Sequence, residues 1–277
     1  MTEVDTQPLR RWAAAVIAWT PGASGELPAH LAPAAFGLDR PGGAVTQLPW
    51  GVEAAERIRR GASLAPYLDH TLLRPDALPE EVQRLAAEAR RHRFGGACVH
   101  PTHLRTLVQA LEGADVVPVA VVGFPSGAHR AEVKGLEARL AVQDGAREVD
   151  AVANLSALRA ADLDRALADA RGVVEAARPW PVKLILETGL LDRRSVVLGA
   201  GVALAAGCSA VKTSTGAGAP GAHVEDVVLL RATVGAALAV KASGGIRTRE
   251  EALRLVAAGA SRLGASASVD LLGEGPG

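Results

Sequence analysis

Most of the chain repeats one pattern, a short apolar run followed by an amphipathic segment. Runs that predict strands occupy residues 65–72, 95–100, 116–123, 148–154, 181–188, 209–214, 238–243 and 262–266. The segments between them, clearest at 79–92, 129–146 and 249–260, place apolar residues at helical spacing. Consecutive strand–helix units without a helix-only or strand-only block favour an α/β fold, the TIM (β/α)8 barrel. An open doubly wound sheet is the alternative, but no GxGxxG follows the first run.

Residues 1–50 do not share this pattern. They are rich in Pro, Gly and Ala, and they hold Trp12, Trp19 and Trp50. We expect a partly irregular N-terminal extension with one short helix, packed through its tryptophans on the body of the protein or on a partner subunit. The barrel domain is then expected over residues 51–277.

Composition argues against several classes of partner. The 30 basic residues balance 30 acidic ones, so nothing favours binding to nucleic acid or to an anionic membrane. No apolar run reaches the roughly 18 residues of a membrane span. The first residues resemble a signal peptide only loosely, because acidic Glu3 and Asp5 stand where a signal peptide is basic. Cys98 and Cys208 are too few for a disulfide framework. We therefore expect a cytoplasmic protein that acts on a small neutral or singly anionic metabolite.

Lysine is rare in this chain, and its placement is unusual. Lys183, Lys212 and Lys241 lie in predicted strands, each 29 residues after the last. Lysine is almost never fully buried without a partner, so these three indicate chemistry. The fourth, Lys134, stands among charged residues on a predicted amphipathic helix, where we expect it to be solvated.

The ends of the predicted strands carry many acid–base groups. In a parallel barrel these ends meet at the C-terminal face, where the active site lies. The residues concerned are Asp69, His70, Thr71, Cys98, His100, Asp150, Lys183, Glu187, Lys212, Lys241 and Ser266.

A lysine that attacks a carbonyl must be neutral, whereas an unperturbed lysine, with a pKa of about 10.4, is almost wholly protonated at neutral pH. Apolar walls and a second cation both disfavour the ammonium form. One lysine could then form a Schiff base beside a charged one, with Asp150 as proton shuttle. Neither effect ranks Lys212 above Lys241 as the nucleophile. The alternative is that the lysines form buried salt bridges with Asp69, Asp150 and Glu187 that only fill the barrel.

Glycine-rich loops follow the last three predicted strands. Residues 214–223, 243–248 and 263–266 combine Gly with hydroxyl residues, where backbone N–H groups can hold an anion. Each loop alone is equally a tight turn, but their position on consecutive late strands predicts a phosphate site. A metal site is not expected, because His100 and His103 have no further His or Cys cluster beside them.

Long motifs then point to one family. They are DHTLLRPDA, ACVHP, VVGFPSGAHRAEVKGLEARLAVQDGAREVDAVAN, VKLILET, VKTSTG, VKASGGIRT and RLGAS, in this order between residues 65 and 268. Through them the chain resembles the deoxyribose-phosphate aldolases. The resemblance implies a class I aldolase on a TIM barrel that needs no cofactor. It would cleave 2-deoxy-D-ribose 5-phosphate reversibly to D-glyceraldehyde 3-phosphate and acetaldehyde.

The resemblance also assigns roles to residues. It implies that Lys212 is the Schiff-base lysine, Lys241 the second lysine that perturbs it, and Asp150 the proton-relay carboxylate. Lys183 is expected to organise Asp150. The other pocket residues implied are Asp69, Thr71, Cys98 and Thr215, and the phosphate-binding positions implied are Gly216, Gly244, Gly245 and Ser266.

The chain departs from the family at three places. Ala217 stands where some members have a phosphate-binding lysine, and Ala267 where a second serine is common, so we expect weaker phosphate binding that relies on backbone donors. Many members carry a tyrosine in a C-terminal tail, whereas the only tyrosine here is Tyr67. We therefore expect slower protonation of the enamine.

Two other functions are compatible with these residues. One is a related barrel aldolase with a different or non-phosphorylated acceptor, and the other is a retired barrel that binds a sugar phosphate as a sensor. The presence of Lys212, Lys241 and Asp150 argues against retirement. We expect sugar phosphates and aldehydes as the small-molecule partners, and a homodimer or homotetramer as the assembly.

Overall fold

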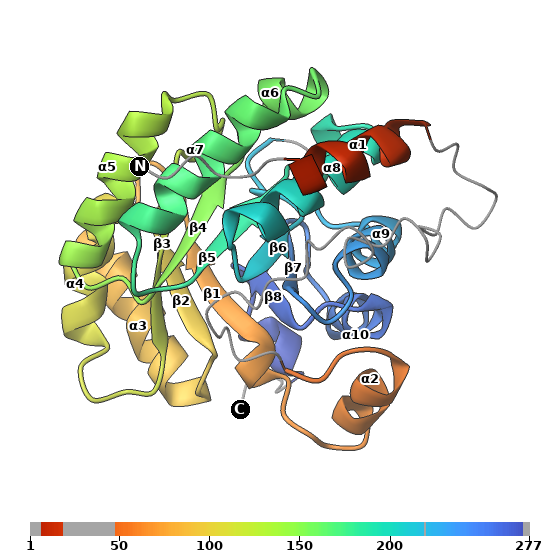
Figure 1. Ribbon diagram of the computed structural model, residues 1–277. Helices are drawn as coiled ribbons and strands as arrows, with labels where there is room; N and C mark the ends of the chain where they lie inside the picture. The colour runs from red at the N-terminus through yellow and green to blue at the C-terminus, as the bar shows by residue number, and fades with distance from the viewer. Residues whose placement is uncertain (1–6, 19–47, 219, 274–277) are drawn as a thin grey trace.

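Eight parallel strands form a closed barrel surrounded by helices (Figure 1). The structure is a computed structural model and describes residues 7–18, 48–218 and 220–273. The strands are β1 (Leu68–Leu72), β2 (Gly96–Val99), β3 (Val117–Val122), β4 (Glu148–Val152), β5 (Val182–Ile185), β6 (Ala210–Lys212), β7 (Ala239–Ser243) and β8 (Arg262–Ala265). Each pairs with the next in the chain, and β8 closes on β1. The predicted TIM (β/α)8 barrel is confirmed.

Helices connect the strands and cover the outside of the barrel. They are α3 (Pro79–His92), α4 (Leu104–Ala110), α5 (Ala131–Gln143), α6 (Leu155–Arg159), α7 (Leu163–Ala176), α8 (Arg193–Ala206), α9 (Val224–Val234) and α10 (Arg249–Ala258). In the described ranges, none of the helices combines the length and the apolar character needed to cross a bilayer.

Local sequence signals explain where several helices begin and end. The Asp192 side chain accepts a hydrogen bond from the backbone N–H of Ser195 at the start of α8, and Gly207 ends that helix with a left-handed φ of 81°. Thr248 and Glu251 form a reciprocal capping box at the start of α10. The helix predicted over 249–260 begins at the same residue as α10.

Alternating side chains give the barrel two different faces. Along β4, Val149 and Ala151 belong to the main hydrophobic core, whereas Glu148 and Asp150 form ion pairs with lysines of other strands. Successive side chains on a strand point to opposite faces, so the outer face builds the core under the helices and the inner face is free for polar groups.

The N-terminal region packs on one side of the barrel. Helix α1 (Gln7–Ala18) lies on α8 (Figure 1). The Trp12 side chain is fully buried against Gly201. A Cβ atom at Gly201 would lie 1.9 Å from the Trp12 ring, so this approach requires glycine. The expected short helix and its packing on the body are therefore observed for Trp12. Trp19 lies outside the described residues, and residue 51 as a domain boundary stays a prediction.

Candidate active site

Charged side chains from six strands meet inside the barrel. We call this set the ion cluster, and all of its members are buried. They are Asp69, Glu148, Asp150, Lys183, Lys212, Lys241 and Arg262.

Asp150 lies at the centre of the ion cluster. Its Oδ2 accepts hydrogen bonds from the amines of Lys212 at 2.9 Å and Lys241 at 2.8 Å. Its Oδ1 accepts one from Lys183 at 3.0 Å. Strand register explains the meeting, since Asp150 lies beside Lys183 and Lys212 beside Lys241 on neighbouring strands. The three strand lysines thus converge on one carboxylate.

A lower layer of charges supports this centre. Lys241 donates to Asp69 at 2.5 Å, and Lys183 donates to Glu148. Arg262 lies 3.4 Å from a carboxylate oxygen of Asp69 and 3.8 Å from one of Glu148. We did not predict Glu148 and Arg262 as members, although Glu148 precedes Asp150 by two residues and so shares its face of the strand.

In the alternative of buried salt bridges that only fill the barrel, the pairing of a lysine with Glu187 is wrong. The Glu187 carboxylate instead accepts hydrogen bonds from the backbone N–H of Thr215, at 3.1 Å from its Oε2, and from the Thr215 hydroxyl. Glu187 lies beyond the end of β5 in a left-handed conformation with a φ of 49°. This turn directs its carboxylate to the loop after β6 instead of to the lysines.

Buried charges set the protonation states of the ion cluster. Burial by itself would raise the pKa of Asp150, but the three lysines outweigh it and hold that pKa well below its usual range. Burial would lower the pKa of Lys241 and of Lys183, but their carboxylate neighbours outweigh it and raise both. Asp150 is therefore an anion, and Lys183 and Lys241 are cations, at neutral pH.

The contacts distinguish Lys212 from the other two lysines. Lys183 and Lys241 each contact more than one carboxylate, whereas the only carboxylate paired with Lys212 among the described residues is Asp150. The charges of the three carboxylates are balanced by Lys183, Lys241 and Arg262, which leaves Lys212 as the surplus amine. Lys212 is also the last residue of β6, at the C-terminal end of the barrel. It is thus, among the described residues, the strand lysine with the fewest carboxylate contacts.

An apolar wall lies beside the ion cluster. Cys98 on β2 packs with Val119 and Val121 of β3, and Thr71 lies next to Cys98 in register. The Thr71 hydroxyl donates to the backbone carbonyl of Asp69 at 2.8 Å. Burial, and then the negative charge of Asp150, raise the pKa of the Cys98 thiol to about 11. Cys98 therefore contributes an uncharged wall at neutral pH.

The loops after β6, β7 and β8 lie at the same end of the barrel. Gly216, Gly244 and Gly245 have left-handed φ values of 79°, 90° and 76°. Gly216 and Gly244 approach closely, because a Cβ atom at Gly244 would lie 3.2 Å from the Gly216 Cα. Ser266 follows β8 and is exposed. The backbone N–H of Ala217 already donates to the Thr215 hydroxyl at 3.1 Å.

Lys134 and Tyr67 lie outside the ion cluster. Lys134 is wrongly predicted to be solvated, since it is fully buried between α5 and α7 and donates to Asp169 at 2.5 Å. An amphipathic pattern cannot show that a charged side chain faces an ion partner on the next helix. Tyr67 precedes β1, at the opposite end of the barrel from the strand C-termini, and its hydroxyl donates to the carbonyl of Pro49 at 2.8 Å.

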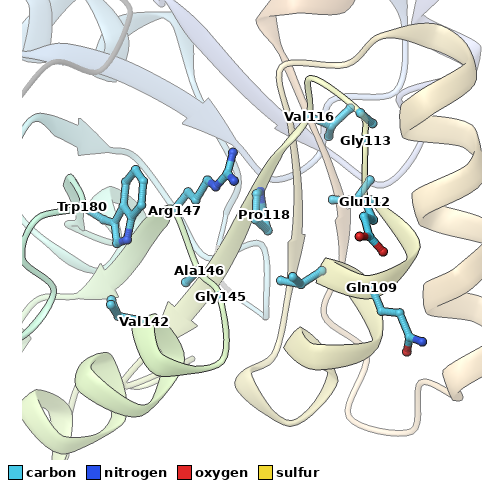
Figure 2. Close-up of a pocket in the computed structure, with 13 residues that line it drawn as sticks. Gln109, Glu112, Gly113, Val116, Pro118, Val142, Gly145, Ala146, Arg147 and Trp180 are labelled. Atoms are coloured by element: carbon cyan, nitrogen blue, oxygen red, sulfur yellow. The ribbon is translucent and has the colours of Figure 1, made fainter.

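A separate cavity lies outside the barrel near the N-terminal ends of β3 and β4. It has a volume of about 490 Å³ and holds no member of the ion cluster. Figure 2 shows Arg147 and Trp180 on one side and Glu112 on the other, with Pro118 between them. The Arg147 guanidinium lies 5.9 Å from the centre of the Trp180 ring. This cavity is therefore distinct from the candidate active site.

Comparison with known proteins agrees with this geometry. Residues 64–273, which contain the whole ion cluster, match the model of the DeoC/LacD family aldolases. The chain belongs to this aldolase family. It is accordingly a carbon–carbon lyase. The curated deoxyribose-phosphate aldolase of Macrococcus caseolyticus is 44% identical over 210 residues, which cover 76% of this chain and 96% of the relative. That of Micrococcus luteus is 45% identical over 220 residues, which cover 76% of this chain and 96% of the relative.

Solved structures of the family extend the similarity. A putative deoxyribose-phosphate aldolase from Coccidioides immitis has a TM-score of 0.81 and 33% identity, and the match covers 99% of both chains. The deoxyribose phosphate aldolase of Aeropyrum pernix, described as a tetramer, has a TM-score of 0.73 and 33% identity, and the match covers 80% of this chain and 95% of that one. The Coccidioides match therefore covers a larger share of this chain than the matches to the curated relatives above.

The raised thiol pKa values predict slow alkylation of both cysteines in the folded aldolase. Burial raises the pKa of Cys208 to about 12, and that of Cys98 is about 11, so the thiolate is scarce until strongly alkaline pH. We expect iodoacetamide to modify neither thiol at mildly alkaline pH, and both in urea, as measured by peptide mass spectrometry. Rapid alkylation of Cys98 in the folded Cys208→Ser variant would contradict this environment.

Proposed function

We propose that the enzyme cleaves 2-deoxy-D-ribose 5-phosphate reversibly to D-glyceraldehyde 3-phosphate and acetaldehyde, through a Schiff base on Lys212. The observation that carries the proposal is the bridge in which one Asp150 oxygen accepts hydrogen bonds from both Lys212 and Lys241. This bridge places the surplus amine of Lys212 beside the cation of Lys241 and beside Asp150, a carboxylate that can carry a proton. The names of the curated relatives support the choice of substrate.

In the cleavage direction, the neutral amine of Lys212 attacks the aldehyde carbon C1 of the open-chain sugar. The carbinolamine loses water and becomes a protonated Schiff base. A base then removes the proton of the C3 hydroxyl, the C2–C3 bond breaks, and its electron pair moves into the iminium to form an enamine. Glyceraldehyde 3-phosphate leaves with the new carbonyl. Protonation of the enamine at C2 and hydrolysis release acetaldehyde and restore Lys212.

Asp150 is assigned the proton transfers in this sequence. Its carboxylate is ionised, and it lies 2.9 Å from the Lys212 amine, so it can accept a proton at one step and return it at another. Lys241 is the cation that shares this oxygen with Lys212, and it is assigned the role of the second lysine beside the nucleophile. Lys183 fixes the other carboxylate oxygen and so orients Asp150.

The phosphate group is assigned to the loops after the last three strands. Gly216, Gly244, Gly245 and Ser266 supply backbone N–H groups and one exposed hydroxyl at the C-terminal end of the barrel. Because Ala217 carries no charge and its N–H is already bonded, phosphate would be held mainly by backbone donors. Asp69, Thr71, Cys98 and Thr215 complete the proposed pocket. The oligomeric state stays a prediction of a homodimer or homotetramer.

Chemical trapping tests the assignment of the nucleophile. We expect incubation with acetaldehyde followed by borohydride to add one ethyl group to Lys212, because reduction fixes the Schiff base. Peptide mass spectrometry of the wild type and of Lys212→Met locates the label, with Lys183→Met as the matched lysine control. An ethyl group on Lys241, or no adduct in an otherwise folded wild type, would overturn the proposed function.

Replacement of Asp150 tests the proton relay. We expect Asp150→Asn to lower kcat by about a hundredfold or more, because an amide cannot carry the proton. The exchange of acetaldehyde methyl protons with deuterated water, followed by NMR, reports the same step without the acceptor. Glu148→Gln is the control, since Glu148 contacts Lys183 but not Lys212. Equal losses of exchange in the two folded variants would argue against a relay through Asp150.

A further inference from the structure

One turn of α5 holds the loop that follows β3 at two points. The backbone N–H of Gly123, at the start of this loop, donates to the Glu137 carboxylate at 2.7 Å. The amine of Lys134 donates to the carbonyl of Gly127 at 3.4 Å. Lys134 and Glu137 lie three residues apart, so both can reach the loop from the same face of the helix. We call these two residues the α5 clamp.

The Lys134 amine also joins the loop to β4 and α7. It donates to the carbonyl of Val152, the last residue of β4, at 2.9 Å, and to the Asp169 carboxylate of α7 at 2.5 Å. Val152 lies two residues after Asp150 on the same strand. One buried amine therefore ties the loop after β3 to the strand that carries the centre of the ion cluster.

Glycines allow the loop to lie directly on this amine and on β4. Gly123 has a φ of 63°, and a Cβ atom there would lie 2.5 Å from the Lys134 Cδ. Gly127 has a φ of 67°, and a Cβ atom there would lie 2.1 Å from the carbonyl oxygen of Ala153. Both the left-handed backbone and the close approach require glycine. The loop thus has little room to move while Lys134 is in place.

Between these glycines, Phe124 forms part of the wall beside the catalytic groups. Its side chain packs against the cluster of Cys98, Val119 and Val121, and its ring meets His100 edge-on with 5.4 Å between centres. Cys98 is near enough to the ion cluster for the charges of Asp150, Lys241 and Lys212 to act on its thiol. The position of Phe124 therefore bears on the space beside the reacting amine.

We propose that Lys134 is a positioning residue that sets donor specificity. It holds Phe124 against the wall formed by Cys98, Val119 and Val121, and it also holds the end of β4, the strand that carries Asp150. The inference rests on the proposed function for its substrate, because the space so limited is that of the small aldehyde bound to Lys212. With the α5 clamp intact, the wall leaves room for acetaldehyde bound to Lys212, but it sterically hinders a donor aldehyde with one more methylene group. Stability alone does not require this lysine, since a buried ion pair can often be replaced by apolar residues of similar volume.

The test compares donors of different size in variants that can fold. Lys134→Met alone would leave the Asp169 carboxylate buried without its cation, so the main variant is the double Lys134→Met/Asp169→Leu. We expect the ratio of kcat/KM for propanal to that for acetaldehyde to rise about tenfold, the usual effect of one methylene in an apolar pocket. Arg139→Met, at an exposed cation of the same helix, is the control and should keep the wild-type ratio.

A double-mutant cycle with Phe124→Ala tests the route of the effect. If Lys134 acts through Phe124, adding Phe124→Ala to the double variant changes the ratio little further. A folded double variant with the wild-type ratio, or fully additive effects, would overturn the inference.

Hydrogen exchange provides a readout that does not depend on the reaction. The backbone amides of residues 123, 124, 126 and 127 should exchange faster in the double variant than in Arg139→Met. If the wild type formed no adduct on Lys212, the proposed function would fail, yet this comparison would still decide whether Lys134 holds the loop. Unchanged exchange would reject the clamp itself.

Discussion

The sharing of the Asp150 carboxylate by three buried lysines is the interaction on which the active site depends. Transferring isolated charges from water into a protein interior is costly, and the cost is offset only when each charge has a close partner. Here the amines of Lys183, Lys212 and Lys241 all donate to Asp150, and Asp69, Glu148 and Arg262 complete the pairing below. Removing any one of the three carboxylates would leave a further buried cation uncompensated. The pairing that offsets the cost of burying these charges therefore also leaves the Lys212 amine in surplus.

The fold and the chemistry use opposite faces of the same strands. Apolar residues at alternate positions, such as Val149 and Ala151 of β4, pack under the helices and build the barrel. The residues between them point inward and are free to be charged, provided that neighbouring strands supply the partners. Lys134 shows the same rule outside the barrel, because a buried lysine between two helices is stable where Asp169 and backbone carbonyls receive its hydrogen bonds.

The sequence predicts the barrel and the central residues of the site for identifiable reasons. Strand and helix spacing follow the division between apolar and polar positions, and strand ends carry the chemistry in a parallel barrel. The ion pairs inside the barrel are harder to predict from the sequence, because they depend on the stagger between neighbouring strands. Arg262 and Glu148 join the ion cluster through register, and Glu187 leaves it through a left-handed turn. The burial of Lys134 depends on Asp169, which lies 35 residues away in the chain.

The small number of lysines makes the central claim directly measurable. The chain contains four, so a sample with carbon-13 at lysine Cε gives four NMR signals that single Lys→Arg or Lys→Met variants can assign. The carboxylates that contact Lys183 and Lys241 stabilise the ammonium form of both side chains, so the pKa of each lies above that of free lysine. We expect both signals to stay at the ammonium position at pH values where free lysine, with a pKa of about 10.4, has already titrated. Titration of Lys241 near neutral pH would contradict this expectation.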